Sequence, residues 1–362
     1  MKKLILVLVV AGLVSSATAT IRTVSQFGTA DYTSVSSAVS ASSTGDTILV
    51  SPGSYNDAIT ITFRTITIIG AGWDATQISP SSGAALTLST SSNGSVLEGM
   101  AIVANTTVLN TGGNTDSVTI RRCTMQTPQN FGYSLTNCRR IYFEDCVLTS
   151  TANSTMFNVS VQTNSTLTLR GCILGFNGTS ASSSVYFSGN NGSPVEITNC
   201  TFVNCRQIFN LSGAQPVVAI NNVLYDWTGG VSWGSYLAGS VFDYNASDAT
   251  GPAIPGDFTN HVSLGANDPF VNYDESLNYQ HGVSDLHLNG GTGGLLLTDA
   301  GNPLIFDVDA SQSDVGAYGG PKPLVDNGVP SYPFVISLDV PNLLESGDDL
   351  NVSSTGRVGP RY

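Results

Sequence analysis

Five stretches of the chain repeat one pattern of apolar and polar positions. Each has two alternating apolar residues, two turn-like residues, and then a small residue followed by another apolar position. The stretches are 118–125, 141–148, 167–174, 195–202 and 218–225. Equivalent positions lie 23, 26, 28 and 23 residues apart, a spacing typical of one turn of a parallel β-solenoid. The pattern therefore predicts stacked rungs that share one core, an all-β fold.

The flanking segments predict how the solenoid begins and ends. Val35, Ala38 and Val39 have helical spacing and precede a strand at 47–50, so we expect a short helix that caps the first rung. Further strands are expected at 59–63, 65–69, 85–88 and 96–103. The segments 267–271, 285–288 and 299–321 are rich in turn residues, and we expect them to form an irregular C-terminal closure.

Cysteines occupy the small position of four successive stretches. These residues are Cys123, Cys146, Cys172 and Cys200. We predict an internal column of free thiols, because cysteine behaves as a small apolar residue in a core. A disulfide between adjacent rungs and a metal site are the alternatives, and the metal site is disfavoured because no His or acid shares the column. Cys138 and Cys205 lie off the column and are candidates for exposure to solvent, and nothing in the sequence indicates that they pair.

Outward positions of the same stretches carry charge. If Val118 and Ile120 point inward, the Arg121 position of each rung points outward. The residues at that position are Arg121, Glu144, Arg170, Thr198 and Asn221, and we expect them to form a solvated ladder. A site for acid–base chemistry needs a base beside acidic groups. The catalytic candidates of this kind are Arg121, Arg122, Arg139, Arg140, Glu144 and Asp145.

Charge and the N-terminal pattern limit the partners and the location. The net charge is −13, and residues 241–362 hold 3 basic against 16 acidic side chains, which argues against nucleic acid and anionic membranes as partners. Lys2 and Lys3, an apolar run at 4–14 and a small-residue segment ending at Ala19 predict a secretory signal peptide cleaved after Ala19. No later segment is apolar for long enough to span a bilayer. We expect a secreted or cell-surface monomer.

Three motifs carry a resemblance to known proteins. Residues 32–55, with Gly45-Asp46 and Pro52-Gly53, resemble the entry motif of the pectin-lyase-like superfamily of right-handed parallel β-helices. Residues 66–78 are similar to the opening of pectin methylesterases, and 307–320 resemble the closing motif of secreted bacterial β-helix proteins. The resemblance implies a right-handed parallel β-helix over 20–321. From the residues themselves we expect a Pro-containing linker and a short β tail over 322–362, with strands at 334–340 and 349–353.

The same resemblance implies where an esterase would carry its catalytic acids. Residues 133–135 and 153–157 stand at the two places where pectin methylesterases have aspartate-led motifs, and neither place holds an acid. A polygalacturonase-like site would need a histidine, and none occurs before His261. An intact catalytic set of these kinds is therefore not found.

Two further groups are candidates for ligand or metal binding. The aromatic side chains of Tyr142, Tyr186, Trp227, Trp233 and Tyr236 are suited to stacking on sugars or to packing in the core. The oxygens of Asp307, Asp309, Ser311 and Asp314 have the spacing of a calcium loop or of turn caps. No cofactor is required, and Ca²⁺ is the one that the pattern allows.

These observations lead to one interpretation and one alternative. We interpret the chain as a secreted bacterial β-helix protein that binds a polysaccharide or cell-surface glycan, or serves as a structural unit. The alternative is a polysaccharide-degrading enzyme, a pectate-lyase-like or pectinesterase-like protein with diverged site residues.

Overall fold

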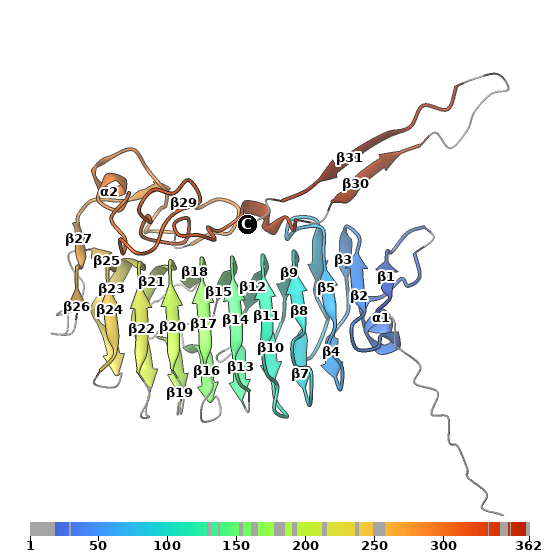
Figure 1. Cartoon of the computed structure of the whole chain (residues 1–362), viewed down its shortest axis with the longest axis horizontal. Helices are drawn as coiled ribbons and strands as arrows, with labels where there is room; N and C mark the ends of the chain where they lie inside the picture. Colours follow the sequence, from blue (N-terminus) through green and yellow to red (C-terminus); the bar gives the residue numbers. More distant parts are fainter. Residues whose placement is uncertain are drawn as a thin grey trace, which may run out of the picture.

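The protein is an elongated stack of short parallel strands (Figure 1). The computed structural model describes residues 19–28, 30–128, 130, 132–136, 138–151, 155–160, 166–176, 185–189, 194–211, 216–235, 239–248, 258–277, 279–331, 333–340, 347 and 349–359. The expected signal peptide lies outside these residues, apart from Ala19. Within the described part, no helix is long and apolar enough to cross a membrane.

One parallel sheet takes one strand from each rung. Its strands, in spatial order, are β1 (Ile21–Val24), β2 (Thr47–Val50), β5 (Thr67–Ile69), β8 (Val96–Glu98), β11 (Val118–Arg121), β14 (Ile141–Glu144), β17 (Leu167–Arg170), β20 (Val195–Thr198), β22 (Val217–Ile220), β24 (Val241–Asp243) and β26 (Phe258–Thr259). Because every second residue points inward, Val118 and Ile120 of β11 are buried as predicted.

A second sheet receives the chain after each corner and wraps around the core. Its strands are β3 (Gly53–Tyr55), β4 (Ile59–Thr62), β6 (Thr76–Ile78), β7 (Leu86–Ser89), β9 (Ala101–Val103), β10 (Leu109–Thr111), β12 (Thr124–Thr127), β13 (Tyr133–Thr136), β15 (Val147–Ser150), β16 (Thr155–Ser160), β18 (Ile173–Phe176), β19 (Val185–Gly189), β21 (Thr201–Leu211), β23 (Val223–Ser235), β25 (Ala246–Asp248) and β27 (Val262–Gly265). The expected strand at 96–103 is thus two strands, because Gly99 turns the corner between them with φ 70°.

The interior is apolar and ordered in columns. The rings of Tyr133, Phe157, Phe187 and Phe209 stack along the axis, with centroid separations of 4.5, 5.1 and 5.6 Å. Helix α1 (Val35–Ala41) buries Val35, Ala38 and Val39 on this core, which confirms the predicted N-terminal cap.

The predicted thiol column is confirmed. Cys123, Cys146, Cys172 and Cys200 are all free and fully buried. Each Sγ faces backbone carbonyl oxygens of the core, as Cys146 Sγ does with Glu144 O at 3.2 Å. Cys138 is also fully buried, contrary to expectation, because it lies at a bridge with Thr115 and inside the core. The side chain of Cys205 lies outside the described set.

The register of the fifth repeat differs from the prediction by one residue. Val195 pairs with Val217, not with Val218, so the residue that continues the Arg121 position after Thr198 is Ile220. Asn221 takes the corner, and Asn222 takes the column position. Because residues 217–220 are all apolar, their pattern fits both registers equally well. In the register that the structure adopts, Asn222 Oδ1 accepts a hydrogen bond from Cys200 N at 2.9 Å.

After the last rungs, the chain turns back along the flank of the solenoid. We call residues 266–331 the strap; it contains β28 (Phe270–Asn272), β29 (Asp285–Leu288), α2 (Thr292–Leu295) and the 3₁₀ turn η2 (Asp326–Gly328). The strap is irregular as expected, and it runs past the carboxyl ends of the first sheet toward the N-terminal rungs (Figure 1). Its buried side chains, such as Leu286, Val315 and Leu324, pack on the outer face of the second sheet and form a separate apolar cluster with it.

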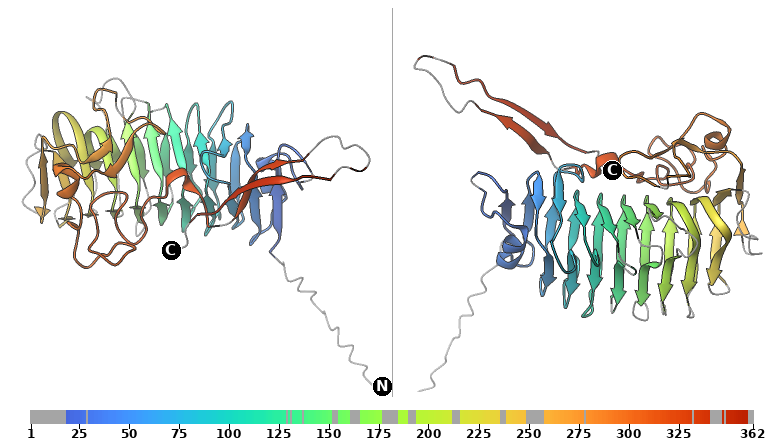
Figure 2. Two further views of the ribbon diagram at one scale, coloured as in Figure 1. Left: turned by 90° about the horizontal axis from the view of Figure 1, so that it is seen from above. Right: turned by 180° about the vertical axis from the view of Figure 1, so that it is seen from behind.

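The chain ends in a hairpin that projects from the solenoid (Figure 2). Strand β30 (Phe334–Asp339) pairs in antiparallel fashion with β31 (Ser353–Arg357). The first strand agrees with the prediction at 334–340, whereas the second lies C-terminal to the predicted 349–353. Gly359 N donates to Pro330 O at 2.7 Å, which ties the base of the hairpin to the strap.

Candidate ligand-binding site

The site is built where the strap crosses the corners of successive rungs. The corner residue after each of six successive strands of the first sheet, β8 to β22, has a left-handed backbone, which favours Gly and Asn. In successive rungs these residues are Gly99, Arg122, Asp145, Gly171, Asn199 and Asn221, with φ between 50° and 70°. Asn199 Nδ2 donates to Asp314 O at 2.9 Å, and Asn302 N donates to Asn221 Oδ1 at 2.7 Å. The later corners therefore hold the strap in place.

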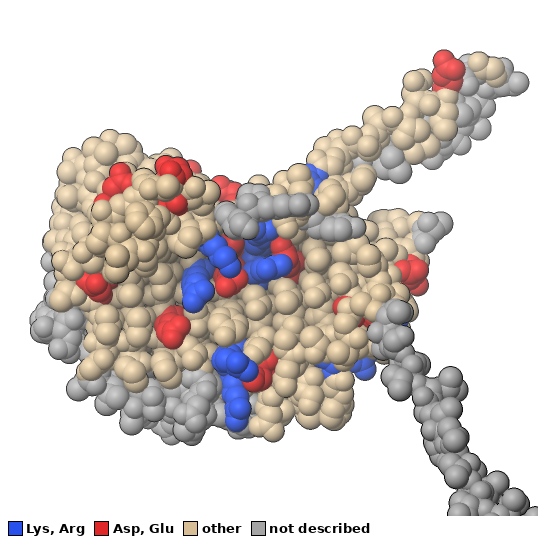
Figure 3. Space-filling model, in the orientation of Figure 1, with Lys and Arg blue, Asp and Glu red and all other residues tan. Residues whose placement is uncertain are grey.

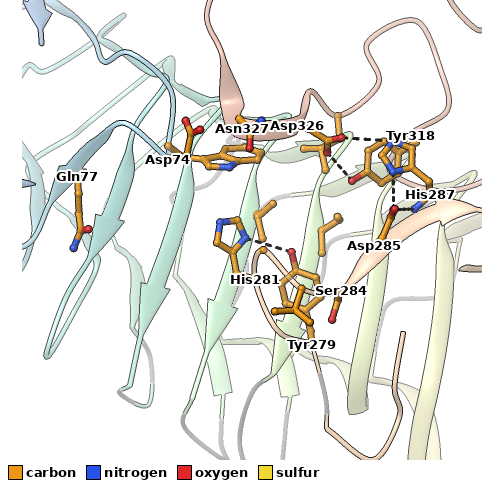
Figure 4. A pocket seen from close by; sticks show the side chains of 16 residues that line it. Asp74, Gln77, Tyr279, His281, Ser284, Asp285, His287, Tyr318, Asp326 and Asn327 are labelled. Carbon is orange, nitrogen blue, oxygen red and sulfur yellow. Dashed lines mark hydrogen bonds and ion pairs between the residues drawn. The ribbon is translucent and has the colours of Figure 1, made fainter. Parts of the chain in front are cut away.

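Toward the earlier rungs, the strap and the second sheet enclose a cavity of about 740 Å³, which we call the strap cavity. The rungs contribute Trp73, Asp74, Gln77, Val147 and Ile173. The strap contributes Tyr279, His281 to Asp285, His287, Tyr318, Leu324, Asp326 and Asn327. Figure 4 shows that these side chains come from segments far apart in the sequence. Two of the three histidines of the protein are among them.

His287 is held between two carboxylates. Its Nδ1 lies 2.7 Å from Asp285 Oδ1, and its Nε2 lies 3.8 Å from Asp326 Oδ2 (Figure 4). The ring stacks on Tyr318 at a centroid separation of 3.6 Å, and the Tyr318 hydroxyl donates to Asp326 Oδ1 at 3.0 Å. Burial opposes ionisation of Asp285, but the N–H groups of His287 outweigh it, and the pKa of Asp285 lies below its usual value. The imidazole is therefore fixed in orientation while 44% of its side chain is exposed.

A second imidazole lies at the other end of the strap cavity. The His281 ring meets Trp73 edge-on at 5.8 Å, and its Nδ1 lies 3.5 Å from the Tyr279 hydroxyl. This packing desolvates the ring, although the residue as a whole is exposed, and lowers the pKa of His281. Neutral His281 can both donate and accept hydrogen bonds. The strap cavity thus combines aromatic faces with carboxylate, imidazole and amide groups.

The predicted catalytic residues divide into two groups. Arg121, Glu144 and Asp145 lie together with Glu98, Arg122 and Lys322 around a cavity of about 310 Å³, which we call the charged pocket. Figure 3 shows basic and acidic side chains gathered in this region beneath the strap. Arg139 and Arg140 are exposed at the opposite end of β14, and Arg140 Nη2 pairs with Asp116 Oδ2 at 2.7 Å. The structure therefore does not bring all the predicted residues into one site.

Two of the ion pairs in the charged pocket differ from those expected of the predicted ladder. Arg121 and Glu144 are register partners as expected. Arg121 Nη2 instead contacts Glu98 Oε2 of the preceding rung at 2.6 Å, and Glu144 Oε2 lies 3.6 Å from Lys322 Nζ of the strap. The ladder is thus partly covered rather than fully solvated.

The aromatic candidates do not form one surface. Tyr186 is fully buried, and its hydroxyl lies within 2.9 Å of two backbone carbonyls, so this ring belongs to the core and is unavailable to a sugar. Tyr142 is half-buried on β14. Trp227 and Trp233 belong to β23, but their side chains lie outside the described set, as does Tyr236.

The calcium-like spacing forms turn caps. Asp309 Oδ1 accepts hydrogen bonds from Ser311 N and Oγ at 3.0 and 2.7 Å, and Asp307 Oδ2 accepts one from Asp314 N at 3.0 Å. Asp314 Oδ1 accepts from Asp299 N at 2.7 Å. Among the described residues, no group of three His, Cys, Asp or Glu side chains is placed to hold a metal ion. These aspartates therefore accept hydrogen bonds from nearby backbone N–H groups, as in the turn-capping alternative.

Comparison with known proteins gives a structural likeness and no sequence match. The sequence matches no protein-family model and no curated protein. The structure is similar to that of the pectate lyase Pel9A, with a TM-score of 0.52 and 15% identity over 83% of this chain and 96% of that chain. It is also similar to a pectin methylesterase from carrot, with a TM-score of 0.47 and 14% identity over 68% of this chain and 83% of that chain.

The likeness to Pel9A and the parallel rungs decide the fold. The chain has a right-handed parallel β-helix fold, which it shares with Pel9A. In this chain, residues 133–135 and 155–157, at the two places where an esterase would have its acids, include core side chains, and residues 153–154 lie outside the described set. Tyr133 and Phe157 stack at 4.5 Å inside the solenoid, because both sit at inward positions of β13 and β16.

Sequence reasoning missed the residues of the strap cavity. His281, His287 and Trp73 were not candidates, although two of the three histidines lie within seven residues of each other in the sequence. That clustering was the available signal. The sequence did not show where these histidines would lie, because the strap reaches the early rungs through contacts between residues about 250 positions apart, such as Trp73 N to Asn327 O at 2.8 Å.

Proposed function

We propose that this protein binds a carbohydrate chain in the strap cavity. The observation that carries the proposal is the lining of this cavity, in which the half-buried Tyr318 and the largely buried Trp73 and Tyr279 lie beside polar planar groups. Sugars bind where aromatic faces meet convergent hydrogen-bonding groups. The volume of about 740 Å³ falls within the range of ligand pockets, about 300–1,000 Å³.

The negative charge around the strap cavity determines which class of carbohydrate it favours. Asp74, Asp285 and Asp326 face it, and Arg357 contacts Asp74 at the rim. Carboxylates accept hydrogen bonds from sugar hydroxyls but repel other carboxylates. The cavity therefore favours a neutral, hydroxyl-rich glycan over a polyanion. With the expected signal peptide at 1–19, the proposal places the protein outside the cell, as a monomer that meets polysaccharide or surface glycan.

His287 supports a second candidate, an enzyme. An imidazole that is oriented by a carboxylate at Nδ1 and exposed to a cavity has the arrangement of a general base. A lyase or esterase acting on a polysaccharide would use such a group to remove or transfer a proton. Turnover of any bound glycan, followed as unsaturated or de-esterified product, separates this candidate from binding alone.

The test is a glycan array followed by titration of the strongest ligand. We expect Asp326→Asn to weaken binding about tenfold, because it removes an acceptor and loosens His287. Arg140→Gln is the matched control, since it alters a charged residue at the far end of β14 and should leave binding unchanged. If no glycan binds, or both variants bind as well as the wild type, the proposal fails.

A further inference from the structure

The charged pocket lies on the other side of the strap from the strap cavity. Within the strap, Leu324, Asp326 and Asn327 line the strap cavity, whereas Lys322 and Ser331 line the charged pocket. The two sites therefore share a wall and have different chemistry. The charged pocket holds three basic side chains in a protein whose net charge is −13.

Part of the basic charge is already paired. Glu98 is 3% exposed and accepts from Arg121 Nε and Nη2 at 2.9 and 2.6 Å and from Arg122 Nη1 at 3.2 Å. Arg122 is itself 7% exposed. These contacts hold the floor of the charged pocket, because a buried carboxylate without such donors would be unstable.

Lys322 and Ser331 are less engaged. Lys322 Nζ lies 3.6 Å from Glu144 Oε2, beyond hydrogen-bond distance, and 46% of its side chain is exposed. Within the described residues, neither Lys322 Nζ nor the Ser331 hydroxyl makes a hydrogen bond. Arg121 keeps 43% of its side chain exposed beside them. Hydrogen-bond donors are thus available to a ligand in the charged pocket.

Asp145 adds a buried oxygen to the same wall. The residue is 3% exposed, and its Oδ1 has no hydrogen-bond partner among the described residues. The groups that face it are Arg122 at 3.8 Å, the preceding residue Glu144, Cys172 in the next rung and Lys322 on the strap. Burial raises the pKa of Asp145 to about 8 despite the nearby Arg122 and Lys322, so at neutral pH the carboxyl carries a proton that it can donate.

We infer that the charged pocket is a second ligand site, which binds a carboxylate anion, free or carried on a sugar, through Lys322, Arg121 and the Asp145 carboxyl. A carboxylate accepts two or more hydrogen bonds and is held best by charged donors. The inference does not rest on the proposed glycan site, because different residues carry it. The protein would then have a site that binds carboxylates next to a cavity that favours neutral sugars.

Calorimetric titration of the full chain with sodium acetate, sodium glucuronate and glucose tests the inference. We expect the carboxylates to bind at pH 6 and glucose to bind far more weakly. If both anions bind, the carboxylate group alone is sufficient for binding. If only glucuronate binds, the sugar ring also contributes to binding. Lys322→Met should weaken anion binding about tenfold, and Arg140→Gln should leave it unchanged. Equal binding of glucose, or an unaltered Lys322→Met variant, would overturn the inference.

The pH dependence gives an independent readout. Between pH 6 and 9 the wild type should lose about tenfold in affinity, because ionised Asp145 repels the bound carboxylate. Asp145→Asn keeps an amide donor, so its affinity should not change over this range. A wild type with flat affinity contradicts the role of Asp145. Circular dichroism confirms the fold of each variant, and Lys322→Met, at a half-exposed position, still tests the site if Asp145→Asn does not fold.

Discussion

Asn199 and Asp314 are joined across the surface of the solenoid, with Asn199 Nδ2 donating to Asp314 O at 2.9 Å. The same amide reaches Ser313 Oγ at 3.1 Å. The bond connects a rung corner to the strap 115 residues later. Because the strap forms one wall of both candidate sites, its attachment is the link between fold and function.

The Asn199→Asp variant should loosen the strap. Aspartate tolerates the left-handed corner, but it replaces a donor with an acceptor that faces carbonyl oxygens. We expect a loss of about 1–3 kcal/mol in the free energy of unfolding and faster proteolysis within 266–331. Asn114→Asp, at an exposed left-handed corner, is the control. Equal protease resistance of the two variants would show that the bond does not hold the strap.

The Gly171→Ala variant tests a close approach of the strap to the corners. Gly171 has φ 58°, and an added Cβ would lie 2.8 Å from Lys322 O and 3.0 Å from Asp145 Oδ1. The left-handed backbone alone costs an alanine about 1–2 kcal/mol, and the contact with Lys322 O adds to it. Thermal melting should show a clear decrease. Gly112→Ala, where the new Cβ meets open space, should melt near the wild type.

Buried acids should make the protein less stable as pH rises. The pKa of Asp145 is about 8 in the folded state against about 3.9 in an unfolded chain. Between these values only the folded state keeps the proton, so the free energy of unfolding falls with pH by up to about 1.4 kcal/mol per unit. Urea unfolding at pH 5 and 8 should show this decrease in the wild type. Asp145→Asn should show less of it, and an identical slope in both proteins would mean that Asp145 does not titrate in this range.

The thiol column should resist modification until the protein unfolds. Burial raises the pKa of Cys123 to about 12, and the thiolate is the reactive form. In a Cys205→Ser variant we expect iodoacetamide to label none of the remaining thiols in the native state and all of them in urea. Labelling of the native protein, detected by mass spectrometry, would show that the column is open to solvent.

The sequence indicates the solenoid because each rung repeats the same inward alternation. The position of Val118 could be identified in four rungs, and the cysteines of those rungs could be assigned to one common column. The register failed at Val217 and Val218, where four apolar residues in a row remove the alternation and the column residue is the polar Asn222. Pattern alone cannot separate a turn asparagine from one that satisfies backbone donors inside a core.

The candidate sites were harder to predict than the rungs. Arg121, Glu144 and Asp145 could be grouped, because they occupy neighbouring rungs at nearly equivalent positions. Arg139 and Arg140 were grouped with them by closeness in sequence, yet a strand of four residues separates them from Glu144 in space. His281 and His287 depend on the path of the strap, which has no period and is set by single contacts at the corners.

Fluorescence of Trp73 tests the proposed glycan site most directly. The protein has three tryptophans, so a variant with Trp227→Phe and Trp233→Phe leaves Trp73, in the wall of the strap cavity, as the sole reporter. Titration with the strongest array ligand should shift or quench its emission with the same dissociation constant that calorimetry gives. Saturable binding that leaves the Trp73 emission unchanged would contradict the account.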